Sequence, residues 1–155
     1  MGKPNMSRPS ITSFKGQYAF LSNFYQRPLA YNGHVYRSAE HAYQANKAWL
    51  IVEHDYVRNA PTPAEAKKRG KEIARVDCWE DIKDDVMLCI LRCKFDNKFN
   101  GLNNPLHFFL LKTEDALLVE GNDWGDTYWG QCPLGNGQNK LGLLLMQVRE
   151  EMRAR

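Results

Sequence analysis

The sequence predicts a single α+β domain that is predominantly helical and carries a few short strands. The chain has 155 residues, a length typical of one domain. Several amphipathic segments follow helix-start signals, whereas few segments have the pattern of strands. No internal repeat, low-complexity tract or interdomain linker interrupts this pattern. We therefore expect one compact domain over residues 13–155.

The N-terminal end of the chain is expected to lie outside this domain. Residues 1–12 contain Gly, Pro and Ser and few large apolar side chains, which predicts a disordered leader. The clearest strand signal is a β-hairpin in which residues 29–31 and 34–36 flank Asn32-Gly33. An Asn-Gly pair readily supplies the two positive φ angles of a two-residue hairpin turn.

Two helices are expected after the hairpin. Ser38 can cap a helix over residues 39–50, whose apolar face would include Trp49 and Leu50. The second helix has three consecutive start signals, namely Thr62 as the cap, Pro63 at the first helical position and Glu65 to complete a capping box. It should end near Gly70.

A third helix is the best candidate for the centre of the core. Asp77 and Glu80 can form a capping box at its start. Its apolar face would contain Trp79, Ile82, Val86, Cys89, Ile90 and Cys93. A short helix over residues 104–111, a buried strand over 116–120 and an amphipathic helix over 141–148 should complete the domain.

Composition narrows the classes of function. The formal net charge is +3, and basic residues are interspersed with acidic ones, which permits a phosphorylated ligand without demanding nucleic acid. No segment approaches the roughly 20 consecutive apolar residues of a membrane span, and no secretory signal is visible. We expect a cytoplasmic protein with no membrane contact.

The cysteines and histidines predict neither a disulfide framework nor a metal site. The four cysteines contain no C-x-x-C pair, and their spacing relative to the histidines does not resemble a zinc ligand set. Cys89 and Cys93 instead fit the buried face of the third helix. We therefore expect reduced thiols, no bound metal and no cofactor.

Chemistry-bearing residues gather in two places. Glu40 lies in the first turn of its predicted helix, where the helix dipole stabilises a carboxylate by about 0.3–1 kcal/mol, so its position alone favours an ordinary dipole partner. The segment 121–139 combines carboxylates, aromatics and glycines. Within it, Gly135-x-Gly137-x-Asn139 precedes the last helix and could bind an anion through free backbone N–H groups. The alternative is an ordinary glycine turn with Asn139 as the helix cap.

Aromatic residues could stack on a base, an interaction worth about 1–3 kcal/mol. Trp124 and Trp129 lie in the polar glycine segment, which favours a role in a site. Trp79 by its own pattern belongs to the core.

Three blocks of the sequence resemble the NADAR, or YbiA-like, family. They are Phe20-Leu-Ser-Asn-Phe24, Ser38-Ala-Glu-His-Ala-Tyr-Gln44 with Lys47, and Asp126-Thr-Tyr-Trp-Gly130 continued by Gly135-x-Gly137-x-Asn139-x-Leu141-Gly142. The resemblance runs in order from Phe14 to Arg153. One departure is Leu21, inserted into the family's Phe-Ser-Asn-Phe block at what would be the pocket rim, which leaves the choice of substrate open.

The resemblance implies a compact, α-rich α+β fold and hydrolysis of N-glycosidic bonds in ribosides. By position, the family's functional Glu, Trp and Asp fall on Glu40, Trp79 and Asp126, which makes Trp79 an expected site residue. Substrate binding is expected from residues in or beside the matching blocks, namely Asn23, Phe24, Arg37, Lys47, Trp129, Gly130, Gly137 and Asn139. The substrate phosphate would lie at the start of the last helix.

The implied reaction needs carboxylates near the anomeric carbon. One of Glu40 and Asp126 would deprotonate a water, and the other would steady the sugar or assist departure of the base. The implied substrates are small phosphorylated ribosides, NAD-like compounds, or ADP-ribosylated guanine, including a modified base in nucleic acid. The competing hypothesis is a non-catalytic module that binds ADP-ribose or NAD through the glycine segment, Arg37 and Lys47. Carboxylates beside a diphosphate would weaken such binding.

Overall fold

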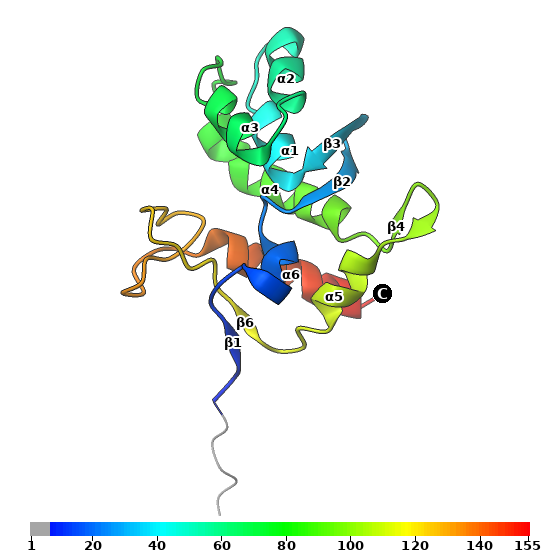
Figure 1. The fold of residues 1–155 in the computed structure, drawn as a ribbon, viewed down its shortest axis with the longest axis vertical. Coiled ribbons are helices and arrows are strands. Elements are labelled where there is room, and N and C mark those ends of the chain that lie inside the picture. The colour runs from blue at the N-terminus through cyan, green and yellow to red at the C-terminus, as the bar shows by residue number, and fades with distance from the viewer. Residues whose placement is uncertain (1–6) are drawn as a thin grey trace, which may run out of the picture.

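The computed structural model describes residues 7–155, which form a mixed α/β fold of helices and short strands (Figure 1). Strand β1 (Ser10–Ile11) pairs in parallel with β6 (Leu117–Leu118). The prediction of a disordered leader is therefore wrong for Ser10–Ile11, because the strand pairing holds them; residues 1–6 of that leader lie outside the described part. The buried strand predicted over 116–120 is confirmed in its centre.

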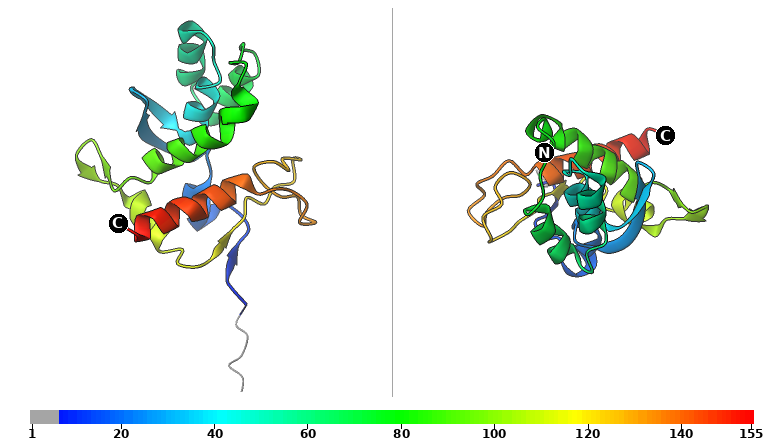
Figure 2. Two further views of the ribbon diagram at one scale, coloured as in Figure 1. Left: turned by 180° about the vertical axis from the view of Figure 1, so that it is seen from behind. Right: turned by 90° about the horizontal axis from the view of Figure 1, so that it is seen from above.

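Helix α4 (Trp79–Lys94) occupies the centre of the core, as predicted. One side of it contacts α1 (Ala39–Ala45) and β2 (Gln26–Tyr31), and another contacts α6 (Lys140–Arg153) (Figures 1 and 2). Its side chains Ile90 and Leu91 are fully buried.

Two details of α4 differ from the prediction. Cys78, and not Asp77, occupies the cap position, and it makes no side-chain capping bond. Glu80 does not complete a capping box, because its carboxylate binds Arg75 and Lys83 at 2.9 and 2.6 Å. Cys89 is exposed, so its assignment to the buried face is wrong.

The predicted hairpin is formed by β2 and β3 (His34–Ser38), which pair antiparallel. Asn32 and Gly33 take φ values of 50° and 84°, the left-handed pair that the turn requires. Ser38 then ends the strand and caps α1, since its hydroxyl accepts a hydrogen bond from the backbone N–H of His41. The hairpin thereby fixes where α1 begins.

The helix predicted over residues 39–50 is shorter than expected. Helix α1 ends at Ala45, and α2 (Ile51–Arg58) begins a new helix. The backbone between them is diverted to another segment, because Trp49 N–H donates to the Ala74 carbonyl at 3.1 Å. Trp49 is consequently 68% exposed, which contradicts its predicted place on an apolar face.

The remaining helices follow their local signals. Helix α3 (Pro63–Gly70) begins after Thr62, whose hydroxyl accepts from Glu65 N–H. Helix α5 (Pro105–Leu111) is capped by Asn104. A small hairpin of β4 (Lys98–Phe99) and β5 (Leu102–Asn103), joined by a tight turn, was not predicted. The 3-10 helix η1 (Gly16–Leu21) was also not predicted.

The segment between β6 and α6 projects from one end of the molecule, and the β4–β5 hairpin projects from the opposite end (Figures 1 and 2). Among the helices of residues 7–155, none has the length and apolar character needed to cross a membrane.

Candidate functional site

A cavity of about 700 Å³ collects residues from five parts of the chain. They come from the segments on either side of η1, from α1 and the residues after it, from α3 and its C-terminal end, from α4 and from the segment after β6. The lining includes the polar residues Lys15, Ser22, Asn23, Glu40, Gln44, Lys47, Lys67, Lys71, Glu120 and Asp126, and the aromatic residues Phe14, Phe24, Tyr43, Trp124 and Trp129. The volume is in the range of small-molecule sites.

Glu40 lies in the first turn of α1 and is 7% exposed. Its backbone N–H donates to the carbonyl of Asn23 at 3.0 Å, which joins two cavity-lining segments. Its Oε1 accepts a hydrogen bond from Gln44 Nε2 at 2.7 Å. Burial raises the pKa of Glu40, and the bond from Gln44 and the charges of Lys67 and Lys47 partly offset that rise.

Asp126 faces the same cavity from the segment after β6. Its Oδ1 accepts hydrogen bonds from the backbone N–H groups of Tyr128 and Trp129 at 3.1 and 2.9 Å. Asn122 holds the backbone of Asp126 with a pair of bonds, one at 2.9 Å and one at 3.1 Å. The carboxylate is therefore fixed in orientation.

Glu120 is a third carboxyl group in the cavity, and the sequence analysis did not select it as a site residue. Its backbone is fixed on both sides, because its N–H donates to Asn139 Oδ1 at 3.0 Å and its carbonyl accepts from Gln131 N–H at 2.9 Å. Burial, followed by the charges of Asp126 and Glu40, raises the pKa of Glu120 to about 7. Its position offered one signal in the sequence, an acidic residue that ends a buried strand just before the polar segment.

Four lysines also line the cavity, namely Lys15, Lys47, Lys67 and Lys71. The ammonium of Lys47 lies 5.1 Å from the centre of the Tyr43 ring, and that of Lys67 lies 6.0 Å from the centre of the Phe24 ring. Burial lowers the pKa of Lys47. Arg37 is outside the lining, because its guanidinium donates to the Ala60 carbonyl at 3.0 Å.

The aromatic residues form an exposed rim and a buried wall. Phe24 and Trp124 are 41% and 57% exposed, and both line the cavity. Trp129 meets the Tyr43 ring edge-on at 5.5 Å. Trp79 is 2% exposed and packs behind Tyr43, with ring centres 5.2 Å apart. The structure thus places Trp79 in the core, one ring away from the cavity.

The start of α6 has few backbone N–H groups free for an anion. The N–H groups of residues 138, 139, 140 and 141 donate to the carbonyls of Thr127, Gly130, Tyr128 and Trp129, respectively. A Cβ at Gly137 would lie 2.3 Å from the Gly130 carbonyl oxygen, so this glycine permits a close backbone contact. Gly130, Gly137 and Asn139 therefore support the segment that carries Asp126, and none of the three lines the cavity.

Asn139 has a structural role of its own. It has a left-handed φ of 49° and makes no capping bond from its side chain. Its side chain instead bonds Glu120 N–H and the Leu118 carbonyl, each at 3.0 Å. Leu21, expected at the pocket rim, is fully buried in the core.

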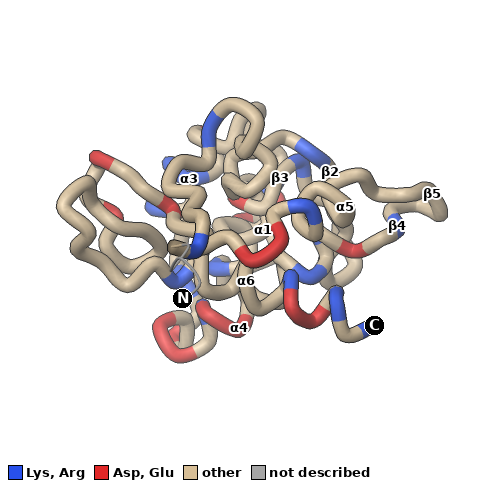
Figure 3. Tube along the Cα trace, turned by 90° about the horizontal axis from the view of Figure 1, so that it is seen from below, with Lys and Arg blue, Asp and Glu red and all other residues tan. Residues whose placement is uncertain are grey.

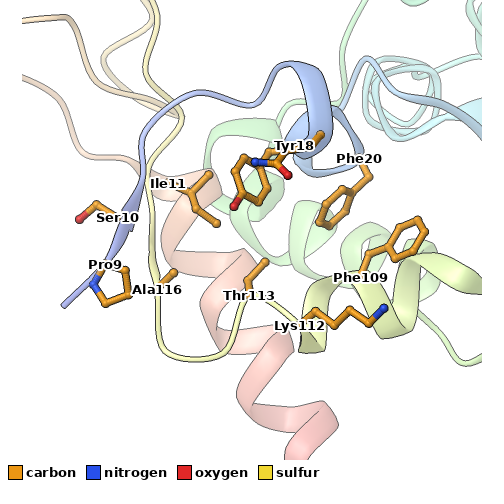
Figure 4. A pocket seen from close by; sticks show the side chains of 10 residues that line it. Pro9, Ser10, Ile11, Tyr18, Phe20, Phe109, Lys112, Thr113 and Ala116 are labelled. Carbon is orange, nitrogen blue, oxygen red and sulfur yellow. The ribbon is translucent and has the colours of Figure 1, made fainter.

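A second cavity of about 500 Å³ lies on another part of the molecule and is lined by residues such as Phe20, Phe109 and Lys112 (Figure 4). No Asp or Glu belongs to its described lining, so it lacks the carboxyl groups of the first cavity. Across residues 7–155, no group of three or more His, Cys, Asp and Glu side chains is arranged to hold a metal ion. Acidic and basic segments are interspersed along the chain in the view of Figure 3.

Comparison with known proteins supplies the class of protein. The NADAR domain matches residues 12–153, nearly the whole chain, and the chain therefore belongs to the NADAR domain family. Its similarity to individual members extends through the fold as well as the sequence.

One relative is the N-glycosidase YbiA of Shigella flexneri, which is 34% identical over 142 residues, or 90% of this chain and 85% of the relative. The NMR structure of Escherichia coli YbiA superposes with a TM-score of 0.81 at 31% identity, covering 96% of this chain and 88% of that one. A riboflavin biosynthesis protein of Vibrio vulnificus is 38% identical over 138 residues, which are 87% of this chain and 36% of that protein. The predicted family and fold class are confirmed.

Proposed function

We propose that this protein is an N-glycosidase that hydrolyses the bond between ribose C1′ and a base or amine nitrogen in a phosphorylated riboside. The observation that carries the proposal is a single cavity lined by three carboxyl groups, Glu40, Glu120 and Asp126, together with four lysines. The relatives named N-glycosidase support the same reaction.

The three carboxyl groups of the cavity suit the positive charge that develops on the ribose during the reaction. Cleavage of a bond from C1′ to nitrogen gives the ribose oxocarbenium character, which nearby carboxylates stabilise. A carboxylate can also take a proton from the attacking water. Glu40 and Asp126 are the candidates for these two roles, since hydrogen bonds fix one oxygen of each carboxylate.

The lysines that line the cavity are suited to binding the substrate phosphate. Lys47 and Lys67 are both partly buried, where a cation attracts a phosphate more strongly than it does in bulk water. We therefore assign the phosphate to the lysines of the cavity. The start of α6 is not assigned this role, because the N–H groups of residues 138–141 are already bonded. The exposed rings of Phe24 and Trp124 at the rim can stack on the leaving base.

The substrate class within this reaction follows from the same cavity. A ribosylaminopyrimidine phosphate presents one phosphate and one small base, and the naming of a relative as a riboflavin biosynthesis protein favours it. ADP-ribosylated guanine, free or in nucleic acid, carries a diphosphate and a second base. The four lysines would serve either compound.

A non-catalytic module for ADP-ribose or NAD remains the competing function. The lysines of the cavity would serve such a module equally well, but three carboxyl groups in the same cavity would repel a diphosphate. Burial raises the pKa of Glu40 and of Glu120, which shows that burying these carboxyl groups together costs free energy. Clusters of this kind are typical of catalytic sites.

The experiment incubates the protein separately with ribosylaminopyrimidine phosphate, ADP-ribosylated guanosine and NAD, and follows base release by chromatography. We expect release from at least one compound, with turnover lost in Glu40→Gln. Wild-type protein that binds ADP-ribose in calorimetry but releases no base from any of the three would favour the binding module. Equal turnover in Glu40→Gln and wild type would trace the activity to another source.

A further inference from the structure

The three carboxyl groups of the cavity have different hydrogen-bonding environments. Asp126 accepts two backbone N–H groups on one oxygen, and Glu40 accepts the side-chain amide of Gln44. Bonds of this kind stabilise an ionised carboxylate. No hydrogen bond or ion pair to the Glu120 carboxyl is present among residues 7–155, although this residue is partly buried. Of the three, Glu120 is the carboxyl group that no described hydrogen-bond donor holds in place.

The charges around Glu120 come from four elements. Glu40 on α1 and Asp126 on the segment after β6 both disfavour its ionisation, whereas Lys67 on α3 and Lys94 on α4 favour it. Lys94 is 4% exposed, and its ammonium is directed to the Ser22 carbonyl at 2.8 Å. It makes no ion pair with Glu120, so it does not hold that group as a carboxylate. The net result is the pKa of about 7 for Glu120.

We propose that Glu120 is the proton donor to the departing nitrogen, a catalytic residue beyond the Glu, Trp and Asp that the family resemblance implies. The assignment rests on the proposed function. Glu40 and Asp126 accept hydrogen bonds that orient an oxygen to take a proton from water, whereas the Glu120 carboxyl accepts none and is left free to donate one, which gives the base and the acid that the reaction needs.

The oxygen of a water forms a bond to C1′ while Glu40 or Asp126 takes one of its protons. The bond from C1′ to nitrogen breaks, its electron pair stays on the nitrogen, and the proton of Glu120 passes to that nitrogen. The products are the free ribose phosphate and the neutral base. The proton gained by the first carboxylate and the proton lost by Glu120 are exchanged through solvent, which restores the starting state.

A leaving-group comparison tests the acid. Glu120→Gln keeps the shape of the side chain and removes its transferable proton. On the N-riboside that wild type hydrolyses, kcat should fall by at least about 100-fold. On 4-nitrophenyl riboside 5-phosphate, whose leaving group departs as an anion, the loss should be below about 5-fold, because no proton is needed. Equal losses on both substrates would overturn the assignment.

Asp123→Asn is the matched control, because Asp123 is an exposed acid in the same segment and outside the cavity lining. It should leave both rates unchanged.

A measurement without substrate keeps the assignment separate from the proposed function. Carbon-13 NMR of protein labelled at the Glu carboxyl carbons should show one resonance that titrates near pH 7 and is absent from Glu120→Gln. Titration of that resonance near the ordinary value of 4.5 would overturn the acid role even if the protein is an active glycosidase. Titration near pH 7 without base release from any riboside would count against the proposed function alone.

Discussion

The lysines of the cavity and the start of α6 are two places that could hold a phosphate, and they differ in whether their donor groups are already bonded to other protein groups. At the start of α6, the N–H groups of residues 138–141 are bonded to carbonyls of residues 127–130. In the cavity, Lys47 and Lys67 have no carboxylate partner in an ion pair within the described chain. The comparison teaches that a glycine-rich helix start binds anions only where its donors remain unpaired.

The segment after β6 therefore contributes to the site indirectly. Its carbonyls close the start of α6, and this packing holds Asp126 and Trp129 against the cavity. Substitutions of cavity-lining residues should therefore change turnover and phosphate binding, whereas substitutions of the glycines before α6 should change the stability of the fold. The predictions below separate these two contributions, beginning with the largest effect.

Glu40→Gln should lower kcat by at least about 100-fold, the usual scale for loss of an acid–base group. The fold should be retained, because Gln can still accept the hydrogen bond from Gln44 through its amide oxygen. Steady-state kinetics and a thermal melt of the same preparation measure the two effects. Unchanged turnover with a lowered melting temperature would reduce Glu40 to a partner of the helix dipole.

Gly137→Ala should destabilise the fold by about 2–4 kcal/mol, since a Cβ is unfavourable at positive φ and collides with neighbouring atoms. The φ is 140°, and the new Cβ would meet the Gly130 carbonyl oxygen at 2.3 Å. Denaturant unfolding measures the change. Gly135→Ala is the control, because its φ of 83° is also left-handed but the space around it is open. It should lose only about 1–2 kcal/mol.

Any kinetic effect of Gly137→Ala should be the same for phosphorylated and dephosphorylated ribosides. A selective rise in KM for the phosphorylated compound would return the phosphate to the start of α6 and reverse the comparison.

Lys67→Met should raise KM for a phosphorylated riboside by roughly 10-fold with little change in kcat, the pattern expected when uniform binding is lost. A dephosphorylated riboside should be affected much less. Lys68→Met provides the control, since Lys68 is the next residue of α3, is exposed and does not line the cavity. An equal KM for the phosphorylated riboside in the two variants would show that Lys67 does not bind the phosphate.

The smallest effect concerns the pH dependence of stability. The pKa of Glu120 is raised from 4.5 to about 7, so its contribution to stability is fully present below pH 4.5 and is lost as the pH rises through about 7. The melting temperature of Glu120→Gln relative to wild type should therefore rise by a few degrees between pH 4.5 and 8. Burial lowers the pKa of Lys94 to about 7, so its contribution has the opposite sign and is lost as the pH falls through about 7. Burial, the larger cause of the Lys94 shift, is common to both proteins, so the difference between them reports mainly on Glu120. A constant difference across this range would contradict the raised pKa of Glu120.

The sequence by itself determined the elements whose signals are local. The Asn32-Gly33 turn, the Ser38 cap and the Thr62 cap each depend on backbone conformation or on a bond within a few residues, and all three form as predicted. The sequence, with its family resemblance, also directed attention to Glu40 and Asp126, which the fold brings to one cavity.

Features that depend on partners distant in the sequence could not be predicted from local patterns. The predicted helix over 39–50 stops early because residue 49 bonds residue 74, and the start of α6 is closed because residues 127–130 supply its acceptors. Trp79 satisfies both readings of the sequence in part, as a core residue that supports a ring of the cavity wall. Glu120 offered only one signal in the sequence, an acidic residue at the end of a buried strand, because its raised pKa arises from burial and from carboxylates on other elements. Burial and hydrogen-bond pairing are properties of neighbours in space, which local sequence patterns do not specify.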